Sequence, residues 1–350
     1  MYRVDSFRAR FQEPALIDDS KNIYYLTGYT GEGCLLITPK SAVIITDFRY
    51  IEQCGRQAPE CSIEQTRMGV SREDIIKRYI ADEKIGELYV ETGVLTVNAF
   101  RRLENALEGI KLIDLPGVIG DMRIVKEQAE LDIISKAAAI SCEAFEKMLP
   151  QLRPGITEKQ ARAILEHELN LAGAEGLAFD TIVASGVNGS LPHAIPSDKL
   201  LQEGELITFD FGAAYQGYCS DCTRTVAMGK ISDELKAVYD TVYSAHLNAL
   251  AAVKPGAVCK DIDAIARNYI DKLYPDSFGH GLGHGVGINI HEAPTVNMRG
   301  ETALVPGHVI TIEPGVYIPG LGGCRIEDTV YVTENGYYDP YTIPKQLRVV

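Results

Sequence analysis

The sequence lacks any long hydrophobic run, and charged residues interrupt its start. None of its apolar segments approaches the roughly 18 residues that a membrane-spanning helix needs. Arg3 and Asp5 fall where a signal peptide would carry an apolar stretch. We therefore expect a cytoplasmic protein with no membrane partner.

Positive charge is also in short supply. The chain of 350 residues carries 34 Lys and Arg against 48 Asp and Glu, a formal charge of −14. An acidic chain repels phosphate backbones, so we expect no nucleic-acid partner. Hydrophobic residues make up 46% of the chain and charged residues 23%, which is an ordinary globular composition. The length predicts about two domains.

Several common catalytic and nucleotide-binding motifs are absent. There is no G-x-S-x-G nucleophile elbow and no P-loop. His291 and Glu292 are followed by Ala293-Pro294-Thr295, so the H-E-x-x-H motif of single-zinc peptidases is missing. The glycines from Gly279 to Gly287 occupy every second position and lead to no helix, which excludes a G-x-G-x-x-G dinucleotide loop.

The eight cysteines are scattered along the chain, and only Cys219 and Cys222 form a C-x-x-C pair. No second pair exists, and no histidine follows at zinc-finger spacing. Because the pair lies in a segment with the pattern of a strand, we favour packed, reduced thiols. Half of a zinc site and a redox pair are the alternatives.

The first part of the chain alternates short apolar strands with amphipathic helices. Residues 43–46 and 87–90 have the pattern of strands, and residues 73–81 have apolar side chains at helical spacing. This segment predicts a small α/β domain without a cluster of metal ligands or nucleophiles. The break at Leu115-Pro116-Gly117 separates it from a part richer in long helices.

The second part contains an internal repeat with an offset of 101 residues, the separation of Pro154-Gly155 from Pro255-Gly256. In each copy a long helix, at 127–149 or 233–253, precedes the Pro-Gly break, and a shorter helix follows it. Thr157 and Gln160 form a capping box for the shorter helix of the first copy. An extended, glycine-containing segment then opens at Phe179 or at Phe278. This order predicts a pseudo-symmetric α+β body whose strands meet in one curved sheet.

Four of the seven histidines fall in two short segments. His193 lies in the first, and His280, His284 and His291 lie in the second, among the alternating glycines. Each glycine inside a helix costs about 1 kcal/mol, so the second segment is extended or looped. A strand face without side chains allows a ligand or another backbone to approach closely. A structural role in the core or at the surface is the alternative for each histidine taken alone.

Two aspartates fall on a predicted hairpin. Alternating apolar residues around Asp210 indicate a strand, the turn centres near residues 215–217, and Asp221 lies on the returning strand. Opposite or diagonal positions would place the two carboxylates about 5–8 Å apart on one face. In a poorly solvated setting, either one carboxylate is protonated or a cation lies between them. A solvated hairpin face is the alternative.

Two further carboxylates occur late in the chain, Glu313 at the end of an apolar strand and Glu327 in the strand of Arg325. Either glutamate alone would also suit the surface. Together with Asp210, Asp221 and His284, they give four carboxylates and one imidazole. Such a set is better suited to Mn²⁺, Co²⁺ or Fe²⁺ than to zinc in a structural thiolate site. Five ligands exceed the needs of one ion and fit two ions about 3.5–4 Å apart that share a hydroxide.

These residues occur in a recognisable order: His193, Asp210 and Asp221, then HGLGHGVG and HE, TIEPG, and GGCRIEDT. The order resembles metallopeptidase family M24, that of the Xaa-Pro peptidases aminopeptidase P and prolidase. The resemblance implies a pita-bread (creatinase/aminopeptidase) fold for a C-terminal catalytic domain, residues 123–350. A smaller creatinase-like α/β domain, residues 1–122, would precede it. The resemblance also implies a homodimer.

The resemblance further assigns the ligands. Asp210 binds one metal ion, His284 and Glu313 bind the other, and Asp221 and Glu327 bridge both. A metal-bridging hydroxide attacks the peptide carbonyl, with Glu313 as general base. We expect two divalent ions, Mn²⁺ first, with Co²⁺, Fe²⁺ or Zn²⁺ as alternatives.

The accessory residues also follow from the resemblance. His291 stabilises the tetrahedral intermediate, and His193 relays a proton or orients the substrate. His280 lines the proline subsite. Arg325 lies near the substrate, where its charge fixes His291, Glu327 or a substrate carboxylate.

We expect an exopeptidase, aminopeptidase P-like, that hydrolyses the Xaa-Pro bond at the N-termini of proline-containing peptides. A prolidase, which takes Xaa-Pro dipeptides only, has the same site and is the alternative. Methionine aminopeptidase fits less well, because it generally lacks a preceding domain. A non-catalytic peptide-binding module of the same fold is the alternative from another class.

Overall fold

The computed structural model describes residues 2–350, which form two compact units divided after Arg123. The first unit ends at this residue, and the second unit runs from Ile124 to Val350. Each unit has its own sheet and its own covering helices. No helix within residues 2–350 has both the length and the apolar character needed to cross a membrane.

The first unit is built on a six-stranded mixed sheet with the order β4-β3-β2-β1-β5-β6. Its strands are β1 (Ala15–Ile17), β2 (Cys34–Ile37), β3 (Ala42–Thr46), β4 (Ser62–Gln65), β5 (Glu87–Val90) and β6 (Lys111–Asp114). Its helices are α1 (Val4–Arg10), α2 (Ser20–Thr27), α3 (Ile51–Gln57), α4 (Arg72–Glu83), α5 (Val97–Ala106) and α6 (Val118–Ile124, which ends one residue into the second unit). The strands predicted at 43–46 and 87–90 and the helix predicted at 73–81 are confirmed as β3, β5 and α4.

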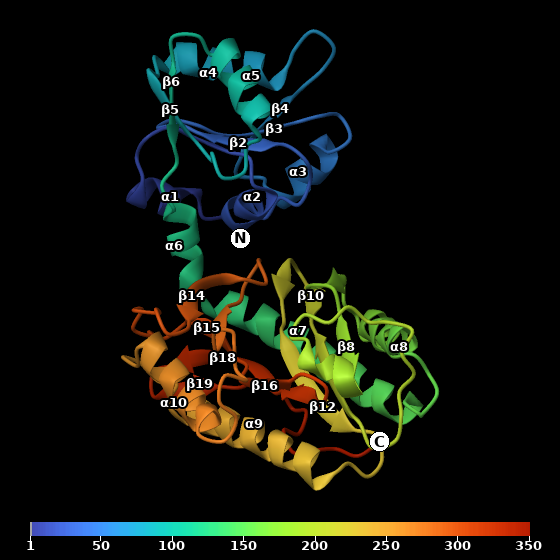
Figure 1. Cartoon of the computed structure of the whole chain (residues 1–350). Helices are drawn as coiled ribbons and strands as arrows, with labels where there is room; N and C mark the ends of the chain where they lie inside the picture. The colour runs from blue at the N-terminus through green and yellow to red at the C-terminus, as the bar shows by residue number, and fades with distance from the viewer. Residues whose placement is uncertain (1) are drawn as a thin grey trace. The chain divides into compact units, whose positions relative to one another are not determined.

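Alternation along the strands explains how this sheet is covered. Leu36, Val43 and Leu88 pack in one core with Ile76 of α4 and Leu103 of α5. The intervening strand residues point to the opposite face, because side chains alternate along a strand. Figure 1 shows helices on both sides of this sheet.

The second unit contains an eight-stranded sheet with the order β14-β13-β15-β18-β12-β9-β8, and β19 pairs with β18. These strands are β8 (Ile182–Ser185), β9 (Leu206–Phe211), β12 (Cys222–Ala227), β13 (Gly283–Gly285), β14 (Glu292–Val296), β15 (Val309–Ile312), β18 (Glu327–Thr333) and β19 (Gly336–Tyr338). Smaller sheets hold β7 (Gly176–Leu177), β10 (Ala213–Tyr215) and β11 (Tyr218–Cys219), and separately β16 (Gly315–Ile318) and β17 (Gly322–Arg325). The helices are α7 (Gln128–Met148), α8 (Glu158–Leu171), α9 (Asp233–Ala251) and α10 (Cys259–Asp271), with 3-10 turns η1 (Leu149–Gln151) and η2 (Gly186–Ser190).

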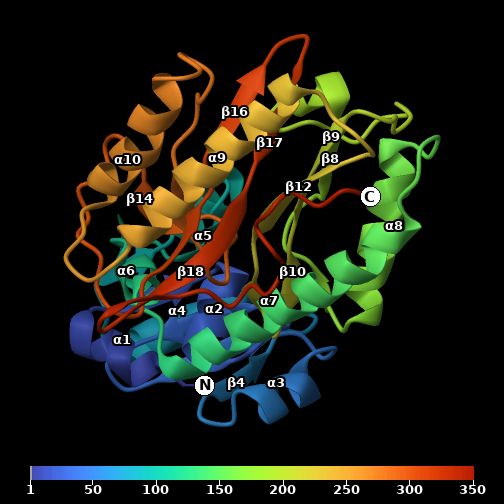
Figure 2. The same cartoon turned by 90° about the horizontal axis from the view of Figure 1, so that it is seen from below.

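The predicted repeat is present in the second unit. Helices α7 and α8 lead to β8 and β9, while α9 and α10 lead to β13 and β15. The two halves join where β12 pairs with β18, and Figure 2 shows the four helices arranged around the shared sheet. The predicted capping box is confirmed, since Thr157 Oγ1 accepts from Gln160 N and Gln160 Oε1 accepts from Thr157 N.

The predicted hairpin between Asp210 and Asp221 is confirmed. The turn lies at Gln216 and Gly217, which have φ of 44° and 72°. The two arms keep one register along their length, since Phe211 pairs with Cys222 in the large sheet and Ala214 pairs with Cys219 in the smaller sheet. The arms approach closely at Gly212, where a Cβ atom would lie 2.0 Å from the carbonyl oxygen of Ser220. A glycine is therefore required at this position.

All eight cysteines are free thiols and buried. Cys219 Sγ lies 3.7 Å from Ile288 O, and Cys222 Sγ lies 3.6 Å from Glu327 O. Both members of the C-x-x-C pair are therefore packed in the protein interior, as predicted.

Candidate metal centre

Strand register places four of the predicted ligands on one face of the large sheet. Asp210 pairs with Thr223, and Thr223 pairs with Glu327, so these three side chains form one row across β9, β12 and β18. Asp221 lies two residues before Thr223, one diagonal step from both carboxylates in the row. The expected diagonal relation between Asp210 and Asp221 is therefore observed.

Glu313 joins the same row from the other side. It directly follows Ile312, the last residue of β15, which pairs with Asp328. In an antiparallel ladder the next residue comes level with Glu327. The side chains of Glu313 and Glu327 therefore lie side by side, one at the end of β15 and the other on β18.

His284, in β13, points its imidazole at these carboxylates. Nε2 lies 3.6 Å from Asp221 Oδ2 and 3.4 Å from Glu313 Oε1. Nδ1 lies 3.1 Å from the carbonyl oxygen of Gly285, which can only accept, so Nδ1 is the donor. The lone pair of Nε2 then faces the carboxylate oxygens. In metal-binding histidines the other ring nitrogen commonly donates to a carbonyl or carboxylate oxygen in this way, which fixes the tautomer.

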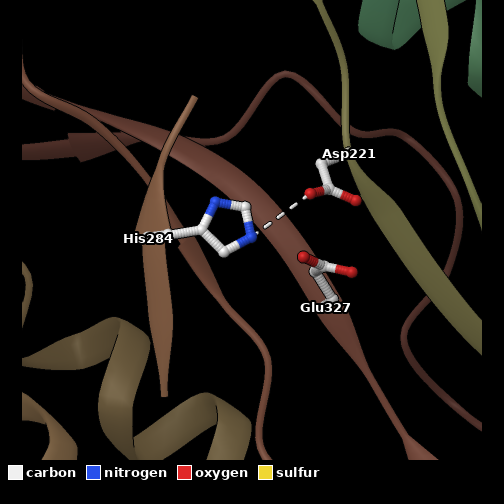
Figure 3. Close-up of side chains that lie close together, drawn as sticks. All are labelled: Asp221, His284 and Glu327. Carbon is white, nitrogen blue, oxygen red and sulfur yellow. Dashed lines mark ion pairs between the residues drawn. The ribbon is translucent and has the colours of Figure 1, made fainter. Parts of the chain in front are cut away.

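Asp221, His284 and Glu327 each offer one ligand atom, and these atoms lie within 4.8 Å of one another. Figure 3 shows the three side chains approaching one point from separate chain segments. Each atom presents a lone pair toward the others. A cation between them would remove the repulsion.

The alternating glycines allow this approach. A Cβ atom on Gly283 would lie 2.0 Å from Thr311 O, and one on Gly285 would lie 2.2 Å from Ala293 O. The neighbouring strands β15 and β14 thus occupy the space that side chains would need. The extended segment and the close approach of another backbone were both predicted, and both are confirmed.

Burial and like charge dominate the electrostatics of the site. The pKa of Asp221 is raised well above its usual value by burial and by the charges of Glu327, Asp210 and Glu313. Burial and the charges of Glu313 and Asp210 raise the pKa of Glu327 in the same way. Burial raises the pKa of Glu313 to about 8. Without a cation, Glu313 therefore largely retains its proton at neutral pH.

The pKa values of the buried histidines His284 and His280 shift in the opposite direction. Burial lowers the pKa of His284 to about 4, so its imidazole is neutral and has a free lone pair at neutral pH. Burial also lowers the pKa of His280 to about 4. Its Nδ1 faces Gly281 O at 2.8 Å, and its Nε2 lies 2.8 Å from the hydroxyl of Tyr317.

Asp210 carries an unpaired acceptor. Its Oδ2 accepts a 2.6 Å hydrogen bond from Arg325, but its buried Oδ1 has no hydrogen-bond partner within residues 2–350. Orphaned buried acceptors of this kind call for an explanation such as an ion. The four carboxylates, one of which has the orphaned Oδ1 of Asp210, and the neutral imidazole of His284 fit a site for hard divalent cations.

All nine predicted site residues line one cleft of about 610 Å³. They are His193, Asp210, Asp221, His280, His284, His291, Glu313, Arg325 and Glu327. The ring of His291 lies 4.4 Å from that of His284, and His193 is an exposed residue in the loop after η2. The cleft wall also includes apolar side chains such as Phe179, Ile182 and Ile290.

Arg325 is buried, with 4% of its surface exposed. It donates to Asp210, to the Tyr317 hydroxyl at 2.9 Å and to Pro192 O at 3.2 Å. Its Nε donates to Thr223 Oγ1 at 3.1 Å. Of the expected partners His291 and Glu327, it reaches only Glu327, and does so through Thr223, whose hydroxyl donates to Glu327 at 2.7 Å.

Two residues of the site were missed by sequence reasoning. Thr223 was detectable, because it lies two positions after Asp221 on a strand and therefore shares its face. Tyr317 joins Arg325 to His280 through one hydroxyl. It is one of 18 tyrosines, and nothing in its sequence neighbourhood distinguishes it.

Each of the two units matches a known protein family. The profile of metallopeptidase family M24 matches residues 132–334, and that of the creatinase/prolidase N-terminal domain matches residues 4–125. An uncharacterised peptidase of Bacillus subtilis, YqhT, is 40% identical over 337 residues, covering 96% of this chain and 95% of that protein.

Two solved structures resemble the whole chain. The Xaa-Pro dipeptidase from Bacillus anthracis is 38% identical, with a TM-score of 0.96 and 99% of each chain covered. The X-Pro aminopeptidase from Thermotoga maritima is 38% identical, with a TM-score of 0.91 and 97% of each chain covered. These similarities confirm the expected pita-bread catalytic domain and the creatinase-like domain before it.

The M24 profile covers more than half of the chain, and the curated relative is similar over nearly its whole length. The family uses divalent metal ions, in agreement with the donor set in the cleft. The chain belongs to metallopeptidase family M24 and is a hydrolase of peptide bonds.

Proposed function

We propose that this peptidase hydrolyses the Xaa-Pro bond at the N-terminus of proline-containing peptides. Convergence of the five ligand-type side chains in one cleft carries the metal-dependent part of this proposal. The substrate class rests on two similar structures whose names refer to Xaa-Pro dipeptidase and X-Pro aminopeptidase.

The proposed ligands are Asp210 for one ion, His284 and Glu313 for the other, and Asp221 and Glu327 for both. When bound, two divalent cations would polarise the scissile carbonyl and lower the pKa of the attacking water. We propose Mn²⁺ as the first choice, because oxygen-rich sites with one imidazole suit it. The orphaned Oδ1 of Asp210 supports its role as a ligand.

The chain's own residues supply binding and proton transfer. Glu313 accepts the proton of the attacking water as the general base. His291 hydrogen-bonds the oxyanion that develops at the carbonyl. His193, on the exposed loop, orients the substrate or passes the proton to the leaving nitrogen, and His280 lines the proline subsite.

Proline preference has a physical basis in such a cleft. An Xaa-Pro amide has no N–H, and the proline ring fixes φ. Peptidase sites that hydrogen-bond the N–H of the scissile amide therefore cannot hold this substrate. A site that acts on the carbonyl oxygen needs no N–H donor from the substrate. The apolar wall with Phe179 and Ile290 suits the ring.

The two similar structures support two specificities equally. Our first proposal is an aminopeptidase P-like enzyme, which accepts peptides longer than two residues. The second is a prolidase limited to dipeptides. We also propose a cytoplasmic homodimer, to be tested by the molar mass of the purified protein in solution.

The test uses purified protein with added Mn²⁺, an Xaa-Pro dipeptide and an Xaa-Pro-Xaa tripeptide. Hydrolysis of the tripeptide would exclude a strict dipeptidase, and hydrolysis of the dipeptide alone would establish one. Hydrolysis of neither would contradict the proposal and favour a binding module. Asp221→Asn should abolish turnover of the fold-intact protein, whereas Asp240→Asn, on the exposed face of α9, should not.

A further inference from the structure

The last residues of the chain pack against the segments that carry the two shared ligands. Asp221 lies in the short gap between β11 and β12, so its backbone has no partner in the strand ladder. Its N–H donates to the hydroxyl of Tyr341 at 2.9 Å, and its carbonyl accepts from the hydroxyl of Thr329 at 2.9 Å. Two side chains thus fix the backbone of a proposed metal ligand.

The same C-terminal segment also reaches the other shared ligand. The backbone carbonyl of Glu327 accepts a 2.6 Å hydrogen bond from Arg224. Arg224 in turn donates to Ile343 O at 3.1 Å and to Asp328 Oδ1 at 2.6 Å. Since side chains alternate along β12 and β18, Arg224 and Asp328 lie on the face opposite Thr223 and Glu327.

Buried charge holds the segment in place. Lys345 Nζ lies 3.0 Å from Asp328 and 2.7 Å from Asp339. The hydroxyl of Tyr239 in α9 donates to Lys345 O at 2.8 Å. Residues 339–345 are therefore bound at several points to the sheet and to α9, and Tyr341 is itself buried.

We propose that Tyr341 is a positioning residue of the metal centre, which holds the Asp221 carboxylate in its binding geometry through the Asp221 backbone. This proposal rests on the proposed metal site. Residues that orient metal ligands typically change metal affinity or activity 10–100-fold when they are removed. Tyr341 hydrogen-bonds to no other proposed ligand within residues 2–350, so we expect its effect to pass through Asp221.

The test is Tyr341→Phe, which removes only the hydroxyl, with Tyr29→Phe in the first unit as the matched control. Each variant loses the hydroxyl hydrogen bond of a buried tyrosine, but only Tyr341 contacts a proposed ligand. Chelator-treated full-length protein is titrated with Mn²⁺ by calorimetry. We expect about 10-fold weaker binding for Tyr341→Phe and unchanged binding for Tyr29→Phe.

A second measurement separates positioning from general destabilisation. The visible absorption of Co²⁺-loaded protein reports ligand geometry, and it should change for Tyr341→Phe only. Equal affinities and spectra for wild type and Tyr341→Phe would overturn the inference while leaving the metal site intact. Equal losses in the two variants would also overturn it. If wild type bound no metal, both this inference and the proposed function would fail.

Discussion

Arg325 donates a 2.6 Å hydrogen bond to Asp210, a residue 115 positions earlier in the chain. Asp210 belongs to β9 in the first half of the pseudo-symmetric body, and Arg325 ends β17 in the second half. The guanidinium occupies Oδ2 and leaves the buried Oδ1 without a partner. The pair therefore orients one carboxylate oxygen toward the space shared with the other ligands.

We expect Arg325→Lys to lower kcat about 10–100-fold, the range for residues that orient metal ligands. A lysine retains the charge, but its single ammonium cannot replace the planar fork that reaches Asp210, Tyr317 and Thr223. The measurement is steady-state kinetics together with bound metal per chain. Arg348→Lys, at a surface pair with Glu146, is the control. Full activity in Arg325→Lys would contradict this role.

Replacement of a ligand should separate stability from metal binding. In chelator-treated protein, Glu327→Gln should unfold at the same temperature as wild type or higher, because it removes one of several mutually repelling carboxylates. The glutamine oxygen can still accept from Thr223. Added Mn²⁺ should stabilise wild type by about 2.7 kcal/mol at a hundredfold excess over Kd, but not the variant.

Thermal unfolding without Mn²⁺ measures the stability of the metal-free protein, and unfolding with Mn²⁺ measures the stabilisation that the metal adds. Glu301→Gln, at an exposed pair with Lys260, should behave as wild type in both conditions. Equal stabilisation of Glu327→Gln by the metal would show that this glutamate is not a ligand.

The glycines around His280 and His284 offer a matched pair of substitutions. Gly283→Ala places a Cβ atom 2.0 Å from Thr311 O, whereas Gly279→Ala meets no atom within 4 Å. Overpacking of this kind typically costs 1–3 kcal/mol. We expect Gly283→Ala to lower the free energy of unfolding by about this amount and to weaken metal binding, because it displaces His284. Urea unfolding that ranked Gly279→Ala as the more damaging change would refute this account.

His308 should contribute a pH dependence to stability. Burial and the charge of Lys126 lower its pKa to about 4 in the folded protein, against an ordinary value of 6.5. Between these two values the unfolded chain binds a proton that the folded chain does not. Stability from this group is therefore complete above pH 6.5 and decreases as pH falls toward 4, by at most about 1.4 kcal/mol per pH unit.

The comparison is wild type against His308→Asn, whose side-chain oxygen can still accept from Val305 N–H. Urea unfolding at pH 7.5, 6.5 and 5.0 should give a smaller loss of stability for the variant below pH 6.5. Parallel losses in the two proteins would exclude His308 as the source.

The amino-acid sequence by itself determined the ligand types, their order and the local conformation of their segments. Alternating glycines excluded a helix around His284, and period-two alternation placed Asp210 on a strand, because both signals depend only on nearby residues. The repeat of 101 residues predicted the two-halved body, and the motif order identified the family before any coordinates.

Only the tertiary structure decided how those side chains meet. The row from Asp210 through Thr223 to Glu327 depends on the register between strands more than 100 residues apart, and a shift of one residue would turn each side chain to the other face. The partners of Arg325 and the contact of Tyr341 with Asp221 likewise arise from packing between distant segments. Local pattern contains no information about such contacts, because their energies exist only once the sheet and its helices have assembled.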